Sequence, residues 1–386
     1  MILNLIDQEI IDIFFKFYKK DLKNTDENLQ NYLSNKISQN LEKISDDHDF
    51  KEIILQKFSD YNFSFFHVVA KFGSPEDLKK LILLIGIKNL EQTDINNYTA
   101  LHHSAISGRL ENVKILIGFG ANITAKSSNE TRNWCPIHYA CKFGYKNIVE
   151  EFIHSQINKE IRTSFGLTPL HVACEYGHHE IVKYLASIGC DLNAETIAEN
   201  HRLTPLHYAV LINSIKSIET LFKAGADFHK TNDHGDDALI LATKRNFSQI
   251  VKILINYGLV ENINEALSIS VNNNYVDSRD IIEIYLKLRD KLFNKNNLIK
   301  FSKEINQFLE QTNPQNIDDI MLTIFYESKL SPYFIANITK EVGLIKKTEI
   351  NLEKFSAQIG LNDLSKGLKK VHEIITHKKL SKKLKI

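Results

Sequence analysis

The stretch Leu167–Ala194, LTPLHVACEYGHHEIVKYLASIGCDLNA, carries the signals of two short helices joined by a turn. Thr168 can cap the first helix through its hydroxyl, and Pro169 suits the first turn, where its missing N–H is not needed. Gly177 can adopt the positive φ that ends this helix. The second helix has apolar residues at spacings of three and four, which form a single stripe. One such unit cannot bury this stripe alone, so we expect it to pack against similar neighbours.

The TPLH tetrad of this stretch recurs along the chain. Its copies are Ser64–His67, Thr99–His102, Cys135–His138, Thr168–His171, Thr204–His207 and, without the histidine, Asp237–Ile240. Their fourth positions are 35, 36, 33, 36 and 33 residues apart, and a degenerate seventh copy is predicted near Ala266. The spacings above 33 predict extra residues in the turns around Asp94–Tyr98, Ser127–Trp134 and Thr196–Arg202.

In this pattern the chain resembles the ankyrin-repeat family, over roughly Tyr61 to Leu292. The resemblance is specific, because the tetrad, a small-residue pair, a glycine and the second-helix stripe recur in phase. It implies an all-α ankyrin-repeat solenoid across residues 61–293, with six recognisable repeats and a degenerate one. It also implies that the tetrad histidines form hydrogen bonds within and between repeats. Ser155–Asn158 lacks the usual glycine, which predicts an irregular hairpin, whereas Asn213 and Asn246 tolerate the left-handed helix-ending conformation.

The two flanks lie outside the repeat pattern. Residues 1–60 predict an N-terminal helical cap with helices over Ile2–Lys20, about Asn28–Lys43 and about Phe50–Phe58. Residues 294–386 predict a small helical C-terminal domain of no recognised family. Its last 20 residues hold seven lysines and one glutamate. This basic tail is interpreted either as a solvated helix end or as a membrane-surface contact, a nuclear-import patch or a secretion signal.

Composition sets the cellular setting that we expect. The chain is 43% hydrophobic with a net charge of +1, so it is globular and has no global attraction to nucleic acid or acidic lipid. Its four cysteines form no CxxC pair and favour a reducing compartment. The N-terminus lacks a secretory signal and no apolar run is long enough to span a membrane. We therefore expect a cytoplasmic protein. The lysine-, asparagine- and isoleucine-rich composition also suits a bacterial effector secreted into a host cell without a signal peptide, although a protist or other eukaryotic origin explains it equally well.

No catalytic motif is evident. The sequence has no P-loop, GxSxG, HExxH or dinucleotide-type GxGxxG, and we predict no catalytic residue, cofactor, metal or small-molecule substrate. Cys141 and Cys174 occupy equivalent places in consecutive repeats and are interpreted as small buried residues, because catalytic thiols need an electropositive and partly exposed setting.

The predicted recognition surface is the concave groove. In ankyrin arrays, the two residues between the small pair and the glycine face this groove, and large apolar side chains there reduce solubility unless something covers them. Aromatic residues are also enriched in interaction hot spots. The predicted partner-binding residues, including two from a neighbouring hairpin finger, are Phe72, Arg132, Trp134, Lys142, Phe143, Glu175, Tyr176, Leu211, Ile212 and Arg245. In the alternative interpretation, the C-terminal helices fold back over the groove.

One further position is a candidate for modification. Asn193, in GCDLNA, matches the hairpin asparagine that asparaginyl hydroxylases modify in some ankyrin proteins. The alternative is an ordinary hairpin hydrogen bond.

The sequence thus favours non-catalytic protein–protein recognition by an adaptor or effector. Two alternatives stay open: an enzyme whose C-terminal domain modifies a captured partner, and a membrane or nucleic-acid docking protein that acts through the basic tail.

Overall fold

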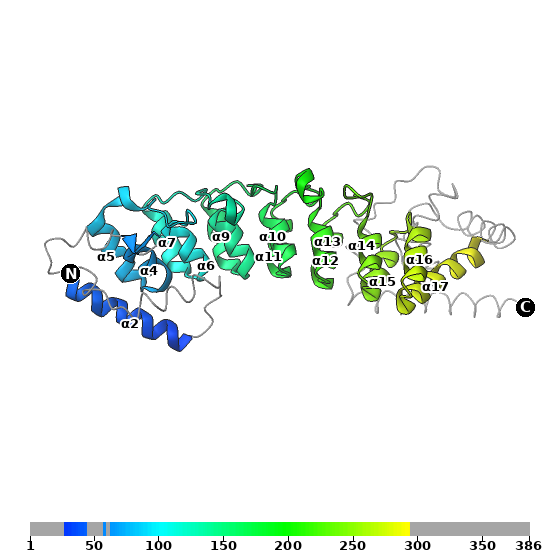
Figure 1. Cartoon of the computed structure of the whole chain (residues 1–386), viewed down its shortest axis with the longest axis horizontal. Helices are drawn as coiled ribbons and strands as arrows, with labels where there is room; N and C mark the ends of the chain where they lie inside the picture. The colour runs from blue at the N-terminus through cyan, green and yellow to red at the C-terminus, as the bar shows by residue number, and fades with distance from the viewer. Residues whose placement is uncertain (1–26, 45–56, 59–61, 294–386) are drawn as a thin grey trace, which may run out of the picture. The chain divides into compact units, whose positions relative to one another are not determined.

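The computed structural model describes residues 27–44, 57–58 and 62–293. These residues form short helices joined by turns, with one pair of two-residue strands. The chain divides into two compact units, Met1–Tyr208 and Ala209–Ile386, which we describe separately. Figure 1 shows the helices of the first unit as successive pairs, which is the all-α repeat solenoid predicted from the sequence. The predicted helix Ile2–Lys20, the C-terminal domain and the basic tail lie outside the described residues.

In the first unit each tetrad opens an inner helix, and an outer helix follows it. Before the repeats come α2 (Glu27–Ile44), β1 (Lys57–Phe58) and β2 (Phe63–Ser64). The inner helices are α4 (Phe65–Phe72), α6 (Ala100–Ile106), α8 (Pro136–Phe143), α10 (Pro169–Glu175) and α12 (Pro205–Leu211), which spans the boundary between the units. The outer helices are α5 (Pro75–Ile85), α7 (Leu110–Gly118), α9 (Lys146–His154) and α11 (His179–Ser187). Three turns of 3₁₀-helix are η2 (Ile87–Asn89), η3 (Asn129–Thr131) and η4 (Ala198–Asn200).

Local signals fix the ends of these helices. Thr168 caps α10 with its hydroxyl, which accepts a 3.4 Å hydrogen bond from the His171 backbone N–H. Pro169 lies in the first turn, where no N–H is required. Gly177 follows α10 with a φ of 72°, and Asn213 takes the same role after α12 with a φ of 59°. These predictions from the sequence are confirmed.

Neighbouring repeats share their apolar stripes. The inner helices α4, α6, α8 and α10 pack against one another in series, and so do the outer helices α5, α7, α9 and α11. In α11 the stripe consists of Ile181, Val182 and Leu185, all buried. Burial of a side chain of this size contributes about 1.5–3 kcal/mol. The stacking therefore supplies the stability that a single repeat lacks.

The N-terminal flank packs against the first repeat. Helix α2, present where about Asn28–Lys43 was predicted, contacts α4 and α5. Leu33 and Ile37 of α2 are buried, and the Ser38 hydroxyl donates a 2.5 Å hydrogen bond to Asp77 Oδ2. The helix predicted over Phe50–Phe58 is corrected at its end, because Lys57–Phe58 instead pairs as an antiparallel strand with Phe63–Ser64.

The inserted residues lie in two of the three predicted turns. The turns Ser127–Trp134 and Thr196–Arg202 each contain a 3₁₀-helix, η3 and η4. The prediction for Asp94–Tyr98 is wrong, because this hairpin has the same length and the same closing hydrogen bonds as the short hairpin Thr163–Leu167. The first repeat takes its extra residues in α5, which has 11 residues where α7 has 9.

The turn at Ser155–Asn158 is regular, contrary to the prediction. Gln156 adopts a φ of 62° in place of the glycine. The Ile157 backbone N–H then donates to the Phe152 carbonyl, as Cys190 does to Leu185 in the next repeat. A single left-handed residue costs only about 1–2 kcal/mol, which the stacked helices can support.

The second unit continues with helix pairs. Its helices are α13 (Ile215–Lys223), α14 (Ala238–Lys244), α15 (Ser248–Asn256), α16 (Ile263–Asn272) and α17 (Val276–Phe293). The sixth tetrad caps α14 without a histidine, because Asp237 Oδ1 accepts a 2.8 Å hydrogen bond from the Ile240 backbone N–H. Helices α16 and α17 pack on each other and on α14 and α15, where the degenerate repeat was predicted.

Candidate functional site

The tetrad histidines are structural groups. In all five tetrads Nδ1 accepts a hydrogen bond of 3.0–3.1 Å from the backbone N–H of the residue that precedes the helix. In His67, His102, His138 and His171, Nε2 lies 3.0–3.2 Å from a carbonyl oxygen in the turn leading to the next repeat. Because Nδ1 accepts, Nε2 carries the proton and donates, so each neutral ring links two repeats. This is the role that the family resemblance implied.

Burial keeps these rings neutral. It lowers the pKa of His102 and of His138 to about 4 and that of His171 to about 3, because a buried ring loses the hydration of its charged form. Both nitrogens of each ring are engaged by the backbone, which leaves none to bind a metal.

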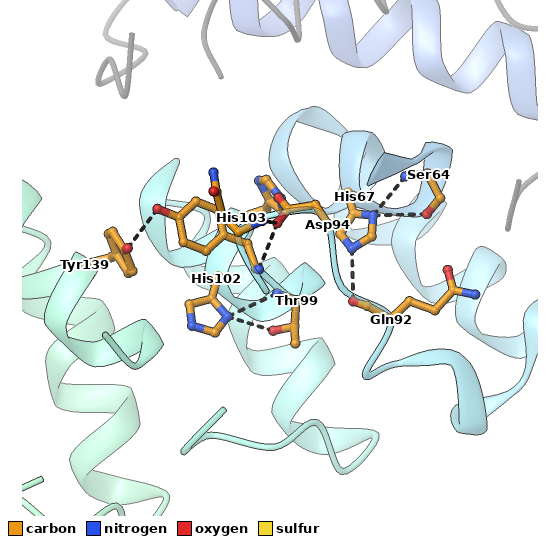
Figure 2. A network of polar contacts seen from close by, with 10 residues as sticks. Ser64, His67, Gln92, Asp94, Thr99, His102, His103 and Tyr139 are labelled. Carbon is orange, nitrogen blue, oxygen red and sulfur yellow. Dashed lines mark hydrogen bonds and ion pairs between the residues drawn. The ribbon is translucent and has the colours of Figure 1, made fainter. Parts of the chain in front are cut away.

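Figure 2 shows a buried ion pair that sequence analysis missed. His103 Nε2 lies 3.0 Å from Asp94 Oδ2, and neither side chain is more than 1% exposed. Asp94 Oδ1 also accepts hydrogen bonds from the backbone N–H groups of Asn96 and Tyr98, at 2.8 and 2.9 Å. Burial opposes the charge of Asp94, but the hydrogen bond and charge of His103 outweigh it and lower the pKa of Asp94. The pair therefore connects the hairpin to α6. The sequence signal for it was the second histidine of Leu101–Ser104, LHHS.

The four cysteines are free, buried thiols. Burial raises the pKa of Cys135 to about 11 and of Cys190 to about 12, and it also raises the pKa of Cys141 and Cys174 well above the ordinary value of a thiol. Since the thiolate is the reactive form, these groups are poor nucleophiles. The interpretation of Cys141 and Cys174 as packing residues agrees with this.

Six of the predicted partner-binding residues come together in the first unit. We call Arg132, Trp134, Lys142, Phe143, Glu175 and Tyr176 the Trp134 cluster. Lys142 and Phe143 end α8, Glu175 ends α10 and Tyr176 follows it, and Arg132 and Trp134 follow η3. Arg132 is exposed and Tyr176 is 39% exposed, whereas Trp134 is only 3% exposed. The cluster thus joins the ends of two inner helices to one hairpin finger.

Aromatic and cationic contacts hold the Trp134 cluster together. The rings of Trp134 and Tyr176 meet edge to face, with centroids 6.5 Å apart. Lys142 Nζ lies 5.8, 5.1 and 5.9 Å from the ring centroids of Trp134, Phe143 and Tyr176. A cation within about 6 Å of an aromatic face gains about 0.5–2 kcal/mol. The ammonium group of Lys142 therefore lies among three rings, and Phe143, 9% exposed, serves mainly as packing.

His178 fixes the backbone beneath Lys142. Its Nε2–H donates a 2.8 Å hydrogen bond to the Lys142 carbonyl, and its ring packs against Gly144, where a Cβ atom would stand only 2.6 Å away. His178 therefore connects the fourth repeat to the third and helps to position the cluster.

The Arg132 side chain is placed by the finger insertion. Arg132 and Asn133 both adopt left-handed backbone conformations, with φ of 69° and 52°. The Arg132 guanidinium lies 5.6 Å from the ring centroid of Phe165, an exposed residue of the next finger. It also lies 3.8 Å from Glu175 Oε1, which is a charge contact rather than a hydrogen bond. Phe165 was not singled out from the sequence, although its place in a hairpin tip was visible.

Backbone hydrogen bonds connect successive fingers. The N–H groups of Ser128, Ser164 and Ile197 donate to the carbonyls of Asn96, Arg132 and Phe165, at 2.7, 3.0 and 3.2 Å. The fingers therefore form one connected edge in the first unit, and Arg132 has a fixed position on it.

Two polar atoms of the Trp134 cluster are buried without hydrogen-bond partners in the described part of the chain. They are Nε1 of Trp134 and Oε2 of Glu175. Burial raises the pKa of the Glu175 carboxyl, and the charges of Arg132 and Lys142 oppose this rise only in part. An unpaired buried polar group costs about 1–3 kcal/mol of stability, so a hydrogen bond between a partner and either atom would recover part of this free energy.

Phe72 does not belong to this surface. It was predicted to face the groove, but it is fully buried, as is every residue of α4. Helix α4 belongs to the first repeat and packs against α2 as well as α6. Phe72 is therefore a core residue in the free protein.

Four other predicted residues lie outside the Trp134 cluster. In the second unit Leu211 is half-buried, Ile212 is 39% exposed and Arg245 is exposed. Asn193 is half-exposed, and its backbone N–H donates a 2.9 Å hydrogen bond to Asp191 Oδ1 in the hairpin. Hydroxylation of Asn193 stays a prediction.

Among the described residues, no group of three or more histidine, cysteine, aspartate or glutamate side chains is arranged to hold a metal ion. No helix in that part of the chain combines the length and hydropathy needed to cross a membrane.

Comparisons with known proteins agree with the fold. A family model described as ankyrin repeats (three copies) matches residues 66–163 and 147–232. The chain is 25% identical over 214 residues to palmitoyltransferase AKR1 of Lachancea kluyveri, which covers 54% of this chain and 27% of that protein. It is 24% identical over 201 residues to the ankyrin repeat protein OPG189 of vaccinia virus, 52% of this chain and 34% of the relative. It is 29% identical over 174 residues to the B-cell lymphoma 3 protein homolog of Mus musculus, 43% and 38% of the two chains.

Residues 66–232 therefore consist of ankyrin repeats. The aligned regions span only 27% to 38% of these relatives' lengths. The class of function that the repeats support is protein–protein interaction, with a protein as the partner.

Proposed function

We propose that this chain is a non-catalytic recognition protein that binds another protein through the Trp134 cluster and the adjoining fingers. The supporting observation is the convergence of six predicted residues on one partly exposed cluster that has an unpaired buried donor. Exposed Tyr176 and Arg132 are residue types that dominate interaction hot spots. The stacked helices hold them in place, so little conformational entropy is lost when a partner docks.

The test is affinity capture with the full chain followed by mass spectrometry. Phe143 is too buried for a clean substitution, so the site variant is Arg132→Ala/Tyr176→Ala, which changes two exposed side chains. The matched control is Leu83→Ala/Lys80→Ala on α5, which also removes one exposed apolar and one charged side chain. A partner captured by the wild type and the control but lost from the folded site variant supports the proposal. Equal capture by all three contradicts it.

A second arm tests the second unit separately. The variant Ile212→Ala/Arg245→Ala removes the two exposed predicted residues of that unit. Loss of the same partner would extend the recognition surface to them, and unchanged capture would limit it to the Trp134 cluster.

The cellular setting is part of the proposal. Four free thiols suit a reducing compartment, which supports recognition inside a cell. If the chain is a secreted effector, its partner is a host protein, so captures are compared between lysates of the source organism and of eukaryotic host cells.

The enzymatic alternative has one specific observation in its favour, the similarity to a palmitoyltransferase. Only 27% of that relative is covered, and within the described residues the buried thiols have raised pKa values that do not suit nucleophilic catalysis. A purified full chain that transfers an acyl group to a captured partner would overturn the non-catalytic assignment.

A further inference from the structure

We propose that the Trp134 cluster binds a carboxylate of the partner, an aspartate or glutamate side chain in an acidic segment. The carboxylate is received by the Arg132 guanidinium and the Trp134 indole N–H, next to the Lys142 ammonium. This inference rests on the proposed recognition function and specifies the chemistry of the partner.

The first argument is the state of Arg132. Its backbone is anchored on both sides, because its N–H donates to Asn129 and its carbonyl accepts from Ser164. Its guanidinium stacks near Phe165, yet it has no hydrogen-bond partner among the described residues. A guanidinium presents a planar fork of donors that matches the two oxygens of a carboxylate. The side chain is thus held in place while its exposed N–H donors are accessible to a partner.

The second argument is the buried indole. Trp134 Nε1–H is a donor only, and it has no acceptor among the residues that the structure describes. An oxygen from a partner would remove this penalty of about 1–3 kcal/mol. Access to the nitrogen requires a side-chain movement, and Tyr176 is the exposed neighbour in contact with the indole that can make it.

The third argument is the balance of charge. Arg132 and Lys142 are cationic, and Glu175 is the acidic member of the cluster. Burial raises the pKa of Glu175, so the environment disfavours its negative charge. The cluster therefore carries excess positive charge that an incoming carboxylate neutralises.

The same geometry disfavours a cationic ligand. Lys142 Nζ already lies within 6 Å of the centroids of Trp134, Phe143 and Tyr176. A lysine or arginine of a partner would compete with Lys142 for these rings and meet the like charge of Arg132. An acidic side chain is the complementary choice.

The experiment selects displayed random short peptides on the full chain and then titrates the enriched peptides. Trp134 is the single tryptophan of the protein, so its indole N–H gives one resolved signal in a ¹H–¹⁵N spectrum and reports on this site directly. We expect enriched peptides to contain aspartate or glutamate, to shift the indole signal and to bind more weakly as salt is added. Replacing the key acid by its amide should weaken binding at least about tenfold.

A double-mutant cycle links the acid to its receptor. Arg132→Gln should abolish most of the difference between the acidic peptide and its amide analogue. The matched control is Arg202→Gln in the equivalent finger, whose guanidinium already bonds Glu195 at 2.8 and 3.1 Å and should contribute nothing.

The remaining outcomes overturn the inference in distinguishable ways. Peptides that shift the indole signal but bind equally well as amides, or that are enriched in lysine or arginine, refute the carboxylate and leave protein recognition at the site standing. Peptides that bind without moving the indole signal refute both the carboxylate and the site. Failure to enrich any peptide above a support without protein also counts against the inference.

Discussion

Gly166 and Ile197 lie so close that a Cβ atom on Gly166 would stand 2.9 Å from the Ile197 backbone nitrogen. That nitrogen donates to the carbonyl of Phe165, the residue before Gly166. Two neighbouring fingers therefore touch through their backbones, at a point where only glycine leaves enough room.

Substitution of Gly166 tests this contact. Gly166 has a φ of +77°, so Gly166→Ala pays about 1 kcal/mol for backbone strain and must also push the two fingers apart. Gly235→Ala is the matched control, because Gly235 has a φ of +78° but no atom within 4 Å of the added Cβ. Thermal unfolding should show the larger loss for Gly166→Ala, and amide exchange at Ile197 should accelerate only in that variant. Equal losses would show that finger contact contributes nothing.

The Asp94–His103 pair predicts a rescue by a second substitution. His103→Val removes one partner of a buried ion pair and should cost about 3–5 kcal/mol, because the Asp94 charge is left uncompensated. In the double variant Asp94→Asn/His103→Val, the asparagine amide keeps an oxygen that can accept from the hairpin N–H groups. Valine is the residue that the fourth repeat has at the position equivalent to His103, namely Val172. The double variant should therefore recover most of the lost stability. Denaturant titration of the single and double variants measures the coupling. A double variant no more stable than His103→Val would contradict a buried charge pair.

The tetrad histidines predict loss of stability in mild acid. Their folded-state pKa values, about 4 for His102 and His138 and about 3 for His171, lie below the ordinary 6.5. The unfolded chain therefore takes up protons first, and stability that is complete above about pH 6.5 falls as the pH drops toward about 4. Thermal unfolding at a series of pH values should show this fall in Tm.

A transplanted tetrad provides the control for this pH dependence. The variant Thr168→Asp/His171→Ile copies the sixth tetrad, in which Asp237 caps α14 without a titrating ring. It should have a shallower dependence of Tm on pH than the wild type. An unchanged slope would mean that His171 does not contribute.

The buried thiols should resist alkylation in the folded protein. Burial raises the pKa of Cys135 to about 11, so iodoacetamide at mildly alkaline pH should modify it about a hundredfold more slowly than an ordinary exposed thiol. Cys174 and Cys190 should be slower still, and Cys141, whose pKa burial also raises, should resist as well. Mass spectrometry of native and urea-unfolded samples measures the four rates. Rapid labelling of Cys135 in the native chain would contradict its burial.

The repeat core was predictable because its signals are local and periodic. Thr168, Pro169 and Gly177 act within one turn of their own position, so a single repeat reveals their roles. The tetrad histidine follows the same logic, since its Nδ1 bonds a backbone group three residues away. Because the same pattern recurs along the chain, it also predicts that successive helix pairs stack on one another.

The errors arose where residues from different parts of the chain meet. Phe72 was expected at the surface from its place within the repeat, but its repeat is the first and also packs against α2. The extra residues of the first repeat could lie anywhere between His67 and His102, and spacing alone could not assign them to α5. The unpaired Trp134 nitrogen depends on the burial of an atom, which no sequence pattern specifies.

The two long fingers share one construction. In each, the first residue of the turn is bonded to the last, as Ser127 to Trp134 and Thr196 to Leu203, and a pair of left-handed residues follows the 3₁₀-helix. The short finger Thr163–Leu167 separates them. Hydrogen bonds within each insertion close its base, so one inserted loop can be replaced by another of the same construction. Sequence change at the tip is decoupled from the packed helices below, and binding specificity can diverge during evolution faster than the scaffold that carries it.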